Sequence, residues 1–191
     1  DSEWQILDTY STTDPVMSVA VQGREAYIPV CRSDTFFDTL KVLNITDTED
    51  ISQLSSRNSQ TNLTVVDIEG DVLVAGRNDG QVLIYNVSKP TAIGGAGVYL
   101  GGSILGGEIA DLQIQGRFLY CLCYMPTDSR GFRIWDIEDP ANPILLPSTI
   151  TFTQGLGLDT EGDIVYLADG LAGVFAVNVS NPTSVFTEGH L

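Results

Sequence analysis

The chain has 191 residues, 43% of them hydrophobic, and a net charge of −16 from 25 acidic and nine basic side chains. This length and composition allow one packed domain or one run of repeats. The acidic residues are spread along the chain, which argues against nucleic acid and anionic membrane surfaces as partners. No apolar run approaches the roughly 18 residues of a membrane span, and no leader peptide is visible at the start, so we expect neither.

An internal repeat dominates the sequence. Four segments align on a shared glycine, at Gly23, Gly70, Gly116 and Gly162, and these glycines lie 47, 46 and 46 residues apart. In each repeat a second apolar alternation follows and ends in Asn or Asp, as in "VLIYNVS" and "FRIWDIE", and a third apolar patch comes next. We therefore predict a single domain divided into an N-terminal outer strand and linker (1–16) and four repeats, at 17–62, 63–108, 109–154 and 155–191, the last with a C-terminal outer strand.

Each repeat predicts short β-strands, because apolar and polar residues alternate with a period of two and β-branched and aromatic residues are enriched. The shared glycines stand where a tight hairpin needs a positive φ, and "NDG" (78–80) and "ADG" (168–170) mark a second hairpin in the same way. Four strands in about 46 residues is the size of one propeller blade. The predicted fold is all-β, a β-propeller of four-stranded antiparallel blades, with about four blades in this chain.

Two segments, "RIWDIEDPANPILL" (133–146) and "VFAVNVSNP" (174–182), resemble the LVIVD-repeat family. In that family an aliphatic run precedes an Asp-aliphatic-Ser-Asn-Pro motif and a Pro-led outer strand. The hairpins "GREAYIPV" and "GDIVYLAD" are similar as well, so the resemblance extends over nearly the whole chain, although "NITDTEDIS" in the first repeat lacks the proline. The resemblance implies a β-propeller from a group of surface or secreted bacterial and archaeal proteins, mostly without assigned activity.

The repeats also alternate in pairs. Repeats one and three share "QGR" and long connections between their second and third strands, "CRSDTFFDT" and "YMPTDSRG", whereas repeats two and four share "EGD" and short connections. The underlying period is therefore about 92 residues, which indicates duplication of a pair of blades. In a propeller these connections share one rim with the links between blades, and the longer, more varied loops usually bind partners.

The candidate binding residues lie in the two long connections. Phe36 and Phe37 are apolar residues in a loop otherwise made of Ser, Asp and Thr, and exposed rings of this kind anchor a protein partner or stack on a sugar. The alternative is that one Phe folds back to cap its own blade. Tyr124, Asp128 and Arg130 are the further candidates in the second connection.

Residues for catalysis are scarce, and we predict that the protein is not an enzyme. His190 is the single histidine and stands next to the C-terminus, so catalytic triads and histidine metal sites have no raw material. The Gly-rich stretch 94–107 has phosphate-loop-like spacings but contains no Lys or Arg, and no helix follows it. We expect this stretch to be a connection between blades.

Two repeated carboxylate pairs are the candidate metal ligands. Asp67 and Glu69 recur as Asp159 and Glu161 in "DIEGD" and "DTEGD", and calcium, the one cofactor considered, prefers several oxygen ligands. The same residues fit a hairpin, so a purely structural role is the alternative. On innermost strands Asp67 and Asp159 would instead line the central channel, as carboxylates do in metal-dependent propeller lactonases.

Four sequons begin at Asn44, Asn62, Asn86 and Asn178. Three of them share one repeat position, which Asp136 occupies in the third repeat, and a short side chain that bonds the turn backbone explains Asn or Asp there equally well. Asn62 lies elsewhere, in the polar loop "SSRNSQTNLT", and is therefore the first choice for a glycan. Together with the acidic surface and the family resemblance, the sequons predict a secreted or cell-surface protein.

Three cysteines, Cys31, Cys121 and Cys123, cannot all pair with one another. Cys121 and Cys123 stand two apart in an apolar strand and so point the same way. We expect them to be buried free thiols rather than a disulfide or a metal pair.

The two ends of the chain, "WQILDTY" (4–10) and "PTSVFTEGHL" (182–191), both predict outer strands, whereas a closed four-bladed ring needs only one. The chain is then part of a larger ring, a closed small ring, or a homo-oligomer joined through its terminal edge strands. The predicted function is a non-enzymatic scaffold that binds a protein or carbohydrate partner through one loop rim. The alternatives are a self-assembling structural subunit, in a filament or surface layer, and a metal-dependent lactonase-like hydrolase.

Overall fold

The computed structural model of the chain describes residues 5–31, 38–59, 63–99, 107–124 and 130–190. These residues form four antiparallel sheets of four strands each, one sheet in each predicted repeat. One short 3₁₀ helix, η1 (Gly170–Ala172), is the single helical element of the described residues. The predicted all-β propeller architecture is confirmed. Among the described residues, no helix has the length and apolar character needed to cross a membrane.

The strands of each sheet pair in chain order. The first sheet contains β1 (Ala20–Gln22), β2 (Glu25–Val30), β3 (Asp38–Asn44) and β4 (Ser52–Ser59), and the second contains β5 (Leu63–Glu69), β6 (Val72–Arg77), β7 (Val82–Asn86) and β8 (Gly94–Tyr99). The third contains β9 (Ile109–Gln115), β10 (Phe118–Tyr124), β11 (Arg130–Asp136) and β12 (Ile144–Phe152), and the fourth contains β13 (Gly157–Glu161), β14 (Ile164–Ala168), β15 (Val174–Asn178) and β16 (Phe186–His190).

A two-residue turn joins the first two strands of every sheet, and the repeat glycine occupies it. The φ angles lie between 58° and 63° at Gly23, Gly70, Gly116 and Gly162, in the region that glycine enters without steric cost. The predicted hairpins are therefore confirmed. This turn also explains why glycine recurs at this place in all four repeats.

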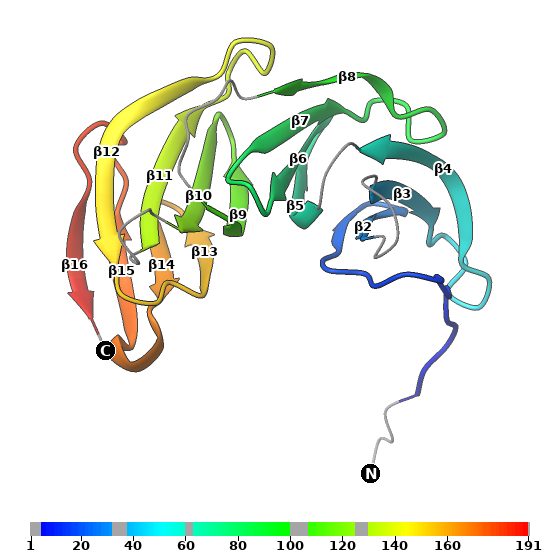
Figure 1. The fold of residues 1–191 in the computed structure, drawn as a ribbon, viewed down its shortest axis with the longest axis horizontal. Coiled ribbons are helices and arrows are strands. Elements are labelled where there is room, and N and C mark those ends of the chain that lie inside the picture. The colour runs from blue at the N-terminus through cyan, green and yellow to red at the C-terminus, as the bar shows by residue number, and fades with distance from the viewer. Residues whose placement is uncertain (1–4, 32–37, 60–62, 100–106, 125–129, 191) are drawn as a thin grey trace.

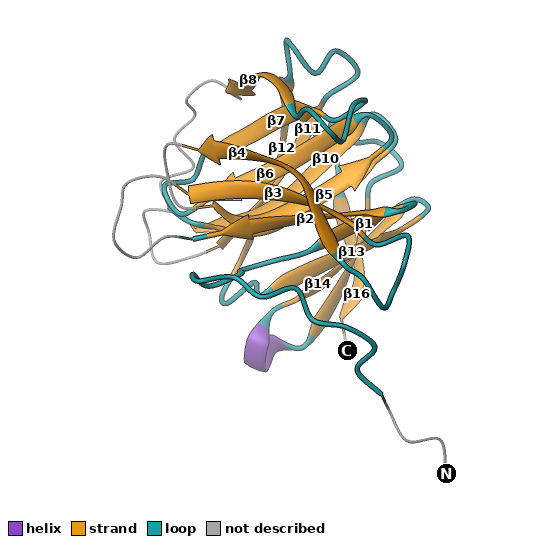
Figure 2. Ribbon diagram, turned by 90° about the vertical axis from the view of Figure 1, so that its right-hand side faces the viewer, coloured by secondary structure: helices purple, strands orange, loops and turns teal. Residues whose placement is uncertain are grey.

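The four sheets stand side by side around an arc (Figure 1). The innermost strands β1, β5, β9 and β13 contact one another in that order, and β4, β8, β12 and β16 lie on the outside. The arc is open, because the first and fourth sheets lie at its two ends and both chain termini are on the open side. Seen from the side, the sheets are stacked face to face (Figure 2).

Apolar side chains fill the space between each pair of neighbouring sheets. A single twisted sheet cannot bury both of its faces, so each sheet depends on its neighbours for a core. The three clusters are represented by Leu40 and Leu73 between sheets one and two, Val74 and Leu112 between sheets two and three, and Phe132 and Val165 between sheets three and four, all buried.

The N-terminal residues do not form the outer strand that we expected. Residues 15–17 pair with the end of β2, where Val16 stands opposite Val30, and residues 8–14, which we call the N-terminal strap, lie against the free face of the first sheet. Asp8 accepts a hydrogen bond from the backbone N–H of Ile51 (2.7 Å), and Tyr10 packs on the buried cluster that includes Ile28 and Leu43. Because no further sheet covers this face in the open arc, the strap takes over the burial of its apolar side chains.

Two segments that we expected to be connections contain outer strands instead. The Gly-rich stretch begins with β8, and β4 includes the first half of the polar "SSRNSQTNLT". An outer strand pairs along one edge and faces solvent, so it tolerates runs of Gly or Ser that give no apolar alternation.

Candidate functional site

The connections between second and third strands lie at the same rim as the links between sheets, and we call this the loop rim. Gly80, in the β6–β7 turn, lies directly against Gly107, in the link from β8 to β9. Asp169, after β14, accepts hydrogen bonds from the backbone N–H groups of Thr153 (3.1 Å) and Gln154 in the link from β12 to β13. The opposite rim carries the glycine hairpins, and we call it the turn rim.

Two of the predicted binding residues can be placed at the loop rim. Tyr124 ends β10 with 37% of its surface exposed, and Arg130 begins β11 opposite Tyr124 in the strand register. Phe36, Phe37 and Asp128 lie outside the described residues.

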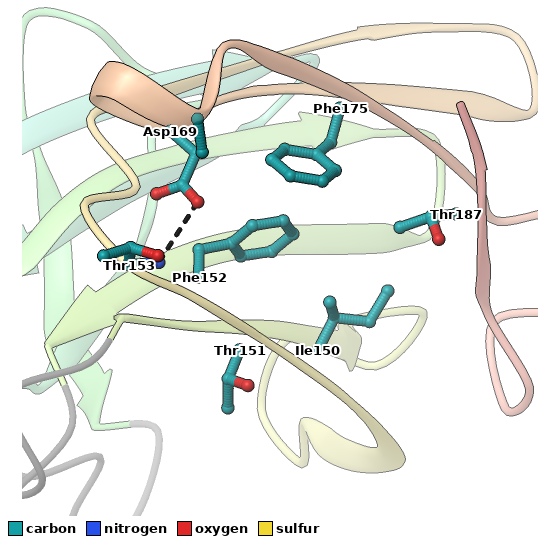
Figure 3. Close-up of a pocket in the computed structure, with 8 residues that line it drawn as sticks. Ile150, Thr151, Phe152, Thr153, Asp169, Phe175 and Thr187 are labelled. Atoms are coloured by element: carbon teal, nitrogen blue, oxygen red, sulfur yellow. Dashed lines mark hydrogen bonds between the residues drawn. The ribbon is translucent and has the colours of Figure 1, made fainter. Parts of the chain in front are cut away.

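A groove of about 540 Å³ opens at the loop rim between the third and fourth sheets (Figure 3). Its apolar wall is formed by Ile150, Phe152 and Phe175, and the two Phe rings meet edge to face with their centroids 5.4 Å apart. The side chain of Thr187 is exposed at its side, whereas Thr151, between Ile150 and Phe152, points to the other face of β12. The groove therefore offers a short apolar surface with one hydroxyl group beside it.

The groove is placed by the strand period and by one buried carboxylate. Ile150 and Phe152 stand two apart on β12 and so share a face, which points toward β15. Asp169 is 2% exposed, and its two oxygens hold the link after β12 through the bonds to Thr153 and Gln154. Sequence reasoning missed this role, because "ADG" was interpreted only as a hairpin signal. Asp38, also buried, holds the link from β4 to β5 in the same way, by accepting the N–H of Leu63 (2.6 Å).

The predicted metal ligands lie on the innermost strands, but most of their carboxylates are used to join neighbouring sheets. Asp67 Oδ2 accepts the N–H of Ile114 (2.6 Å), and Glu69 Oε2 accepts the N–H of Gly116 (2.9 Å). Asp159 Oδ1 accepts a hydrogen bond from the Gln113 side chain (3.2 Å), whereas the Glu161 side chain forms no hydrogen bond with another residue that the structure describes. Among the described residues, no three His, Cys, Asp or Glu side chains are arranged to hold a metal ion. The observed bonds fit the structural alternative, and the calcium site stays a prediction.

A further inner-strand carboxylate, Asp111, was not predicted. It accepts the N–H of Leu158 in the next sheet (2.8 Å) and that of its neighbour Leu112 (2.9 Å). Burial raises the pKa of Asp67 and of Asp111 above the ordinary aspartate value. The backbone N–H groups that each carboxylate accepts lower its pKa, each by less than burial raises it. The charges of Asp67 and Asp159 raise the pKa of Asp111 further. The inner strands therefore carry a row of carboxylates that form hydrogen bonds between neighbouring sheets.

At the turn rim, the shared sequon position has a structural role in every sheet. The side-chain Oδ1 accepts the backbone N–H of the residue two positions later, which closes the turn after the third strand. This bond is found at Asn44 (2.9 Å), Asn86 (3.0 Å), Asp136 (3.0 Å) and Asn178 (3.0 Å). The structural explanation for Asn or Asp at this position is confirmed. Glycosylation stays a prediction, and Asn62 lies outside the described residues.

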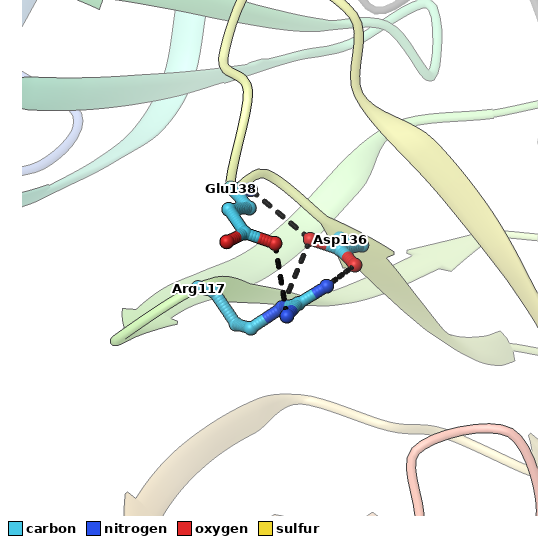
Figure 4. A network of polar contacts seen from close by, with 3 residues as sticks. All are labelled: Arg117, Asp136 and Glu138. Atoms are coloured by element: carbon cyan, nitrogen blue, oxygen red, sulfur yellow. Dashed lines mark hydrogen bonds and ion pairs between the residues drawn. The ribbon is translucent and has the colours of Figure 1, made fainter.

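The third sheet shows why Asp stands at this position there (Figure 4). Arg117, in the glycine hairpin, forms ion pairs with Asp136 and with Glu138 (2.9 Å). Hydrogen bonding to Arg117 holds the pKa of Asp136 below its usual value, and the same bond raises that of Arg117. Arg117 and Glu138 are exposed and Asp136 is partly buried, so we regard the network as a local contact that closes the turn rim of the third sheet.

The cysteine prediction is confirmed for Cys121 and Cys123, which are free and buried in the same cluster. Burial raises the pKa of Cys123 to about 11 and that of Cys121 well above its ordinary value, so both remain thiols at neutral pH. Cys31 is also free, and its thiol lies 2.9 Å from the Leu63 carbonyl oxygen, to which it donates.

Four-stranded sheets packed face to face around an arc define a protein of the β-propeller class. More particularly, the model of the LVIVD repeat matches residues 158–190, which confirms the family resemblance in the fourth sheet. A comparison with curated proteins found no match.

Several solved structures share the fold. The computationally designed Ika4 protein is 16% identical, and the match covers 98% of this chain and 100% of that one with a TM-score of 0.67. A putative 6-phosphogluconolactonase from Bacteroides uniformis is 14% identical over 95% of this chain and 58% of its own, with a TM-score of 0.76. The WD40 domain of Toxoplasma gondii coronin is 14% identical over 95% of this chain and 47% of its own, with a TM-score of 0.66. At these identities the likeness shows the fold alone, and the chain spans about half of the last two structures.

Proposed function

We propose that the protein is a non-enzymatic β-propeller scaffold that binds a protein or carbohydrate partner through its loop rim. The observation that supports this proposal best is the groove between the third and fourth sheets, which opens at that rim. We further place the scaffold outside the cell, on the cell surface or secreted, on the basis of its sequons and its LVIVD repeat.

The groove has the chemistry of a recognition site. The edge-to-face pair of Phe152 and Phe175 gives it an apolar wall of fixed shape, which suits an apolar side chain of a protein or the carbon-bound hydrogens of a sugar ring. The hydroxyl group of Thr187 can donate and accept hydrogen bonds beside this wall. The wall is rigid because Asp169 ties the adjoining link, so little ordering is needed on binding.

Binding is favoured over hydrolysis by the state of the carboxylates. On the inner strands, one oxygen each of Asp67, Glu69 and Asp111 accepts a backbone N–H group of the next sheet, so these carboxylates already have a structural role between sheets. The likeness to the putative lactonase concerns the fold alone.

The experiment probes an array of immobilised peptides and an array of immobilised oligosaccharides with the purified protein and two variants. Thr187→Arg places a long charged side chain beside the apolar wall, and we expect it to weaken binding of each probe about tenfold or more. Thr48→Arg makes the same change at an exposed position on the turn rim and is expected to bind like the unchanged protein. A probe that binds all three proteins equally well would place recognition elsewhere, and binding of no probe on either array would count against the proposal.

A further inference from the structure

The outer face of the fourth sheet is exposed at positions that are buried elsewhere. Tyr120 of the third sheet is 3% exposed and points into the cluster shared with the fourth sheet. Its equivalent 46 residues later, Tyr166, is 41% exposed. Val82 of the second sheet is 3% exposed, and its equivalent 92 residues later, Val174, is 41% exposed. The fourth sheet therefore presents the apolar face that its counterparts cover with the next sheet.

The inner strand of the first sheet is exposed in the complementary way. Val19 and Val21 are 60% and 57% exposed, whereas their equivalents 93 residues later, Leu112 and Ile114, are 3% and 7% exposed against the preceding sheet. Within the described arc, the fourth sheet thus has one uncovered apolar face and the first sheet has the complementary one.

The two ends also match in their hydrogen-bonding groups. Between sheets two and three, Asp67 accepts the N–H of Ile114 and Glu69 accepts the N–H of Gly116. The 92-residue period places Asp159 and Glu161 on the fourth sheet where Asp67 and Glu69 stand on the second. The corresponding offset of 93 residues places the N–H groups of Val21 and Gly23 on the first sheet where those of Ile114 and Gly116 stand on the third. The fourth sheet carries the acceptors, and the first sheet carries the donors, of an interface that already exists inside the chain.

We propose that a second copy of this chain docks on these ends head to tail, with the fourth sheet of one copy stacked on the first sheet of the other. The contact would repeat the interface between sheets two and three, with Tyr166 and Val174 against the apolar face of the first sheet. It uses sheet faces rather than the terminal edge strands expected from the sequence, and it does not rest on the function proposed for the loop rim. Because the two surfaces differ, the contact is heterologous and either closes a ring or continues as a chain of copies.

The N-terminal strap competes for the same place. Tyr166 of a docked copy would lie over Ala26 and Ile28, since Tyr120 packs on the equivalent Val165 and Leu167. In the single chain Tyr10 is packed on that face, held by a bond from its hydroxyl to Gln53 (2.9 Å). Docking must therefore displace Tyr10, and the strap acts as a brake on assembly.

Sedimentation velocity of the 191-residue chain over a range of concentrations tests the proposal, in about 0.5 M NaCl so that the acidic copies do not repel one another. We expect concentration-dependent association of the unchanged chain. Val21→Glu at one end and Tyr166→Glu at the other should each weaken it at least about 100-fold, because each places a charge in an apolar contact. Both positions are exposed in the single chain, so both variants should remain folded monomers.

Mixing the two variants provides the decisive control. Each variant keeps one intact end, and the two intact ends are complementary, so the mixture should form one-to-one heterodimers although neither variant associates alone. If Val21→Glu associates with itself, the fourth sheets pair with each other and the head-to-tail proposal is wrong. A monomer at all concentrations for the unchanged chain, or a mixture that stays monomeric, also overturns it.

The strap is tested by Asp8→Ala, which removes the bond to the N–H of Ile51. We expect association to strengthen about fivefold, because displacing the strap then breaks one hydrogen bond fewer. Weaker association in this variant would show that the strap belongs to the interface and would overturn its role as a brake. Thr9→Ala, a change at an exposed neighbouring side chain, should leave the association constant unchanged.

Discussion

The second and fourth sheets share nearly the same turn sequence in their first hairpins, "EGD", yet one is enclosed and the other ends the arc. Val82 is buried and Val174 is not, and Asp67 bonds the following sheet while Asp159 meets only the preceding one. The repeated sequence therefore determines where the strands and turns lie, whereas the presence of a neighbouring sheet determines how much each side chain contributes to stability. Equivalent substitutions in the two regions measure that difference directly.

The largest difference in stability between two equivalent substitutions is expected at Tyr120 and Tyr166. Tyr120→Ala removes a buried ring that stacks near Phe132, with 6.0 Å between centroids, and should lower the free energy of unfolding by about 3–5 kcal/mol. Tyr166→Ala removes the exposed equivalent and should cost less than about 1 kcal/mol. Urea unfolding at low protein concentration, where the sheet ends are unpaired, compares the two. Equal losses would show that the open face is not open in solution.

An intermediate effect is expected from adding one carbon between sheets. A Cβ at Gly76 would lie 2.7 Å from Ile109 Cγ2 and 2.9 Å from Val65 Cγ1, so Gly76→Ala should force the second and third sheets apart and cost about 1–3 kcal/mol. The equivalent position 92 residues later is Ala168, which is exposed at the open end. Ala168→Val enlarges it with an expected change below about 0.5 kcal/mol. Thermal unfolding of the two variants beside the unchanged chain gives the comparison, and a stable Gly76→Ala would contradict the packing between these sheets.

The smallest effect is a pH dependence. Burial raises the pKa of Asp111 in the folded chain, so its titration favours the folded state fully below the unfolded value of about 3.9, and this contribution is lost as the pH rises through the folded pKa. Asp111→Asn keeps an oxygen for the N–H of Leu158 without the charge. We expect a gain in the free energy of unfolding of less than about 1 kcal/mol at pH 7, which disappears by about pH 3.

Asp139 is the matched control for this titration. The Asn142 side chain and the backbone N–H of Ala141 lower the pKa of Asp139, so its contribution is present above the unfolded value and is lost as the pH falls through the folded one. Asp139→Asn should therefore be less stable than the unchanged chain at pH 7 and approach it in acid. The same sign for both variants would contradict the assigned burial of Asp111.

Much of the fold could be predicted because it depends on local chemistry. The glycines of the hairpins, the apolar runs of β2, β6, β10 and β14, and the turn-closing Asn and Asp side chains all act within a few residues of themselves. The buried thiols of Cys121 and Cys123 followed from their place in one of these runs. An outer strand was predicted for every blade, but the segments that form β4 and β8 were partly taken for connections, since a strand at the edge needs no apolar pattern.

The candidate site could be predicted only in part. The rim was predicted from loop lengths, but the groove depends on Phe152 and Phe175, which come from different sheets and meet only in the assembled arc. Asp169 and Asp111 looked like ordinary polar residues, because their partners lie 15 and 47 positions away in the chain. Contacts between sheets leave no periodic trace in the sequence.

By itself the sequence determined the number of sheets, the position of every glycine hairpin and the pairing of the repeats into a 92-residue unit, because turn geometry and alternation are local properties. Only the tertiary structure decided that the arc stays open, that the N-terminal strap covers its first face and that the fourth sheet is left bare. The physical reason is that burial belongs to a pair of faces. A sheet can specify its own face, but the neighbour that covers it must come from elsewhere in the chain or from another copy.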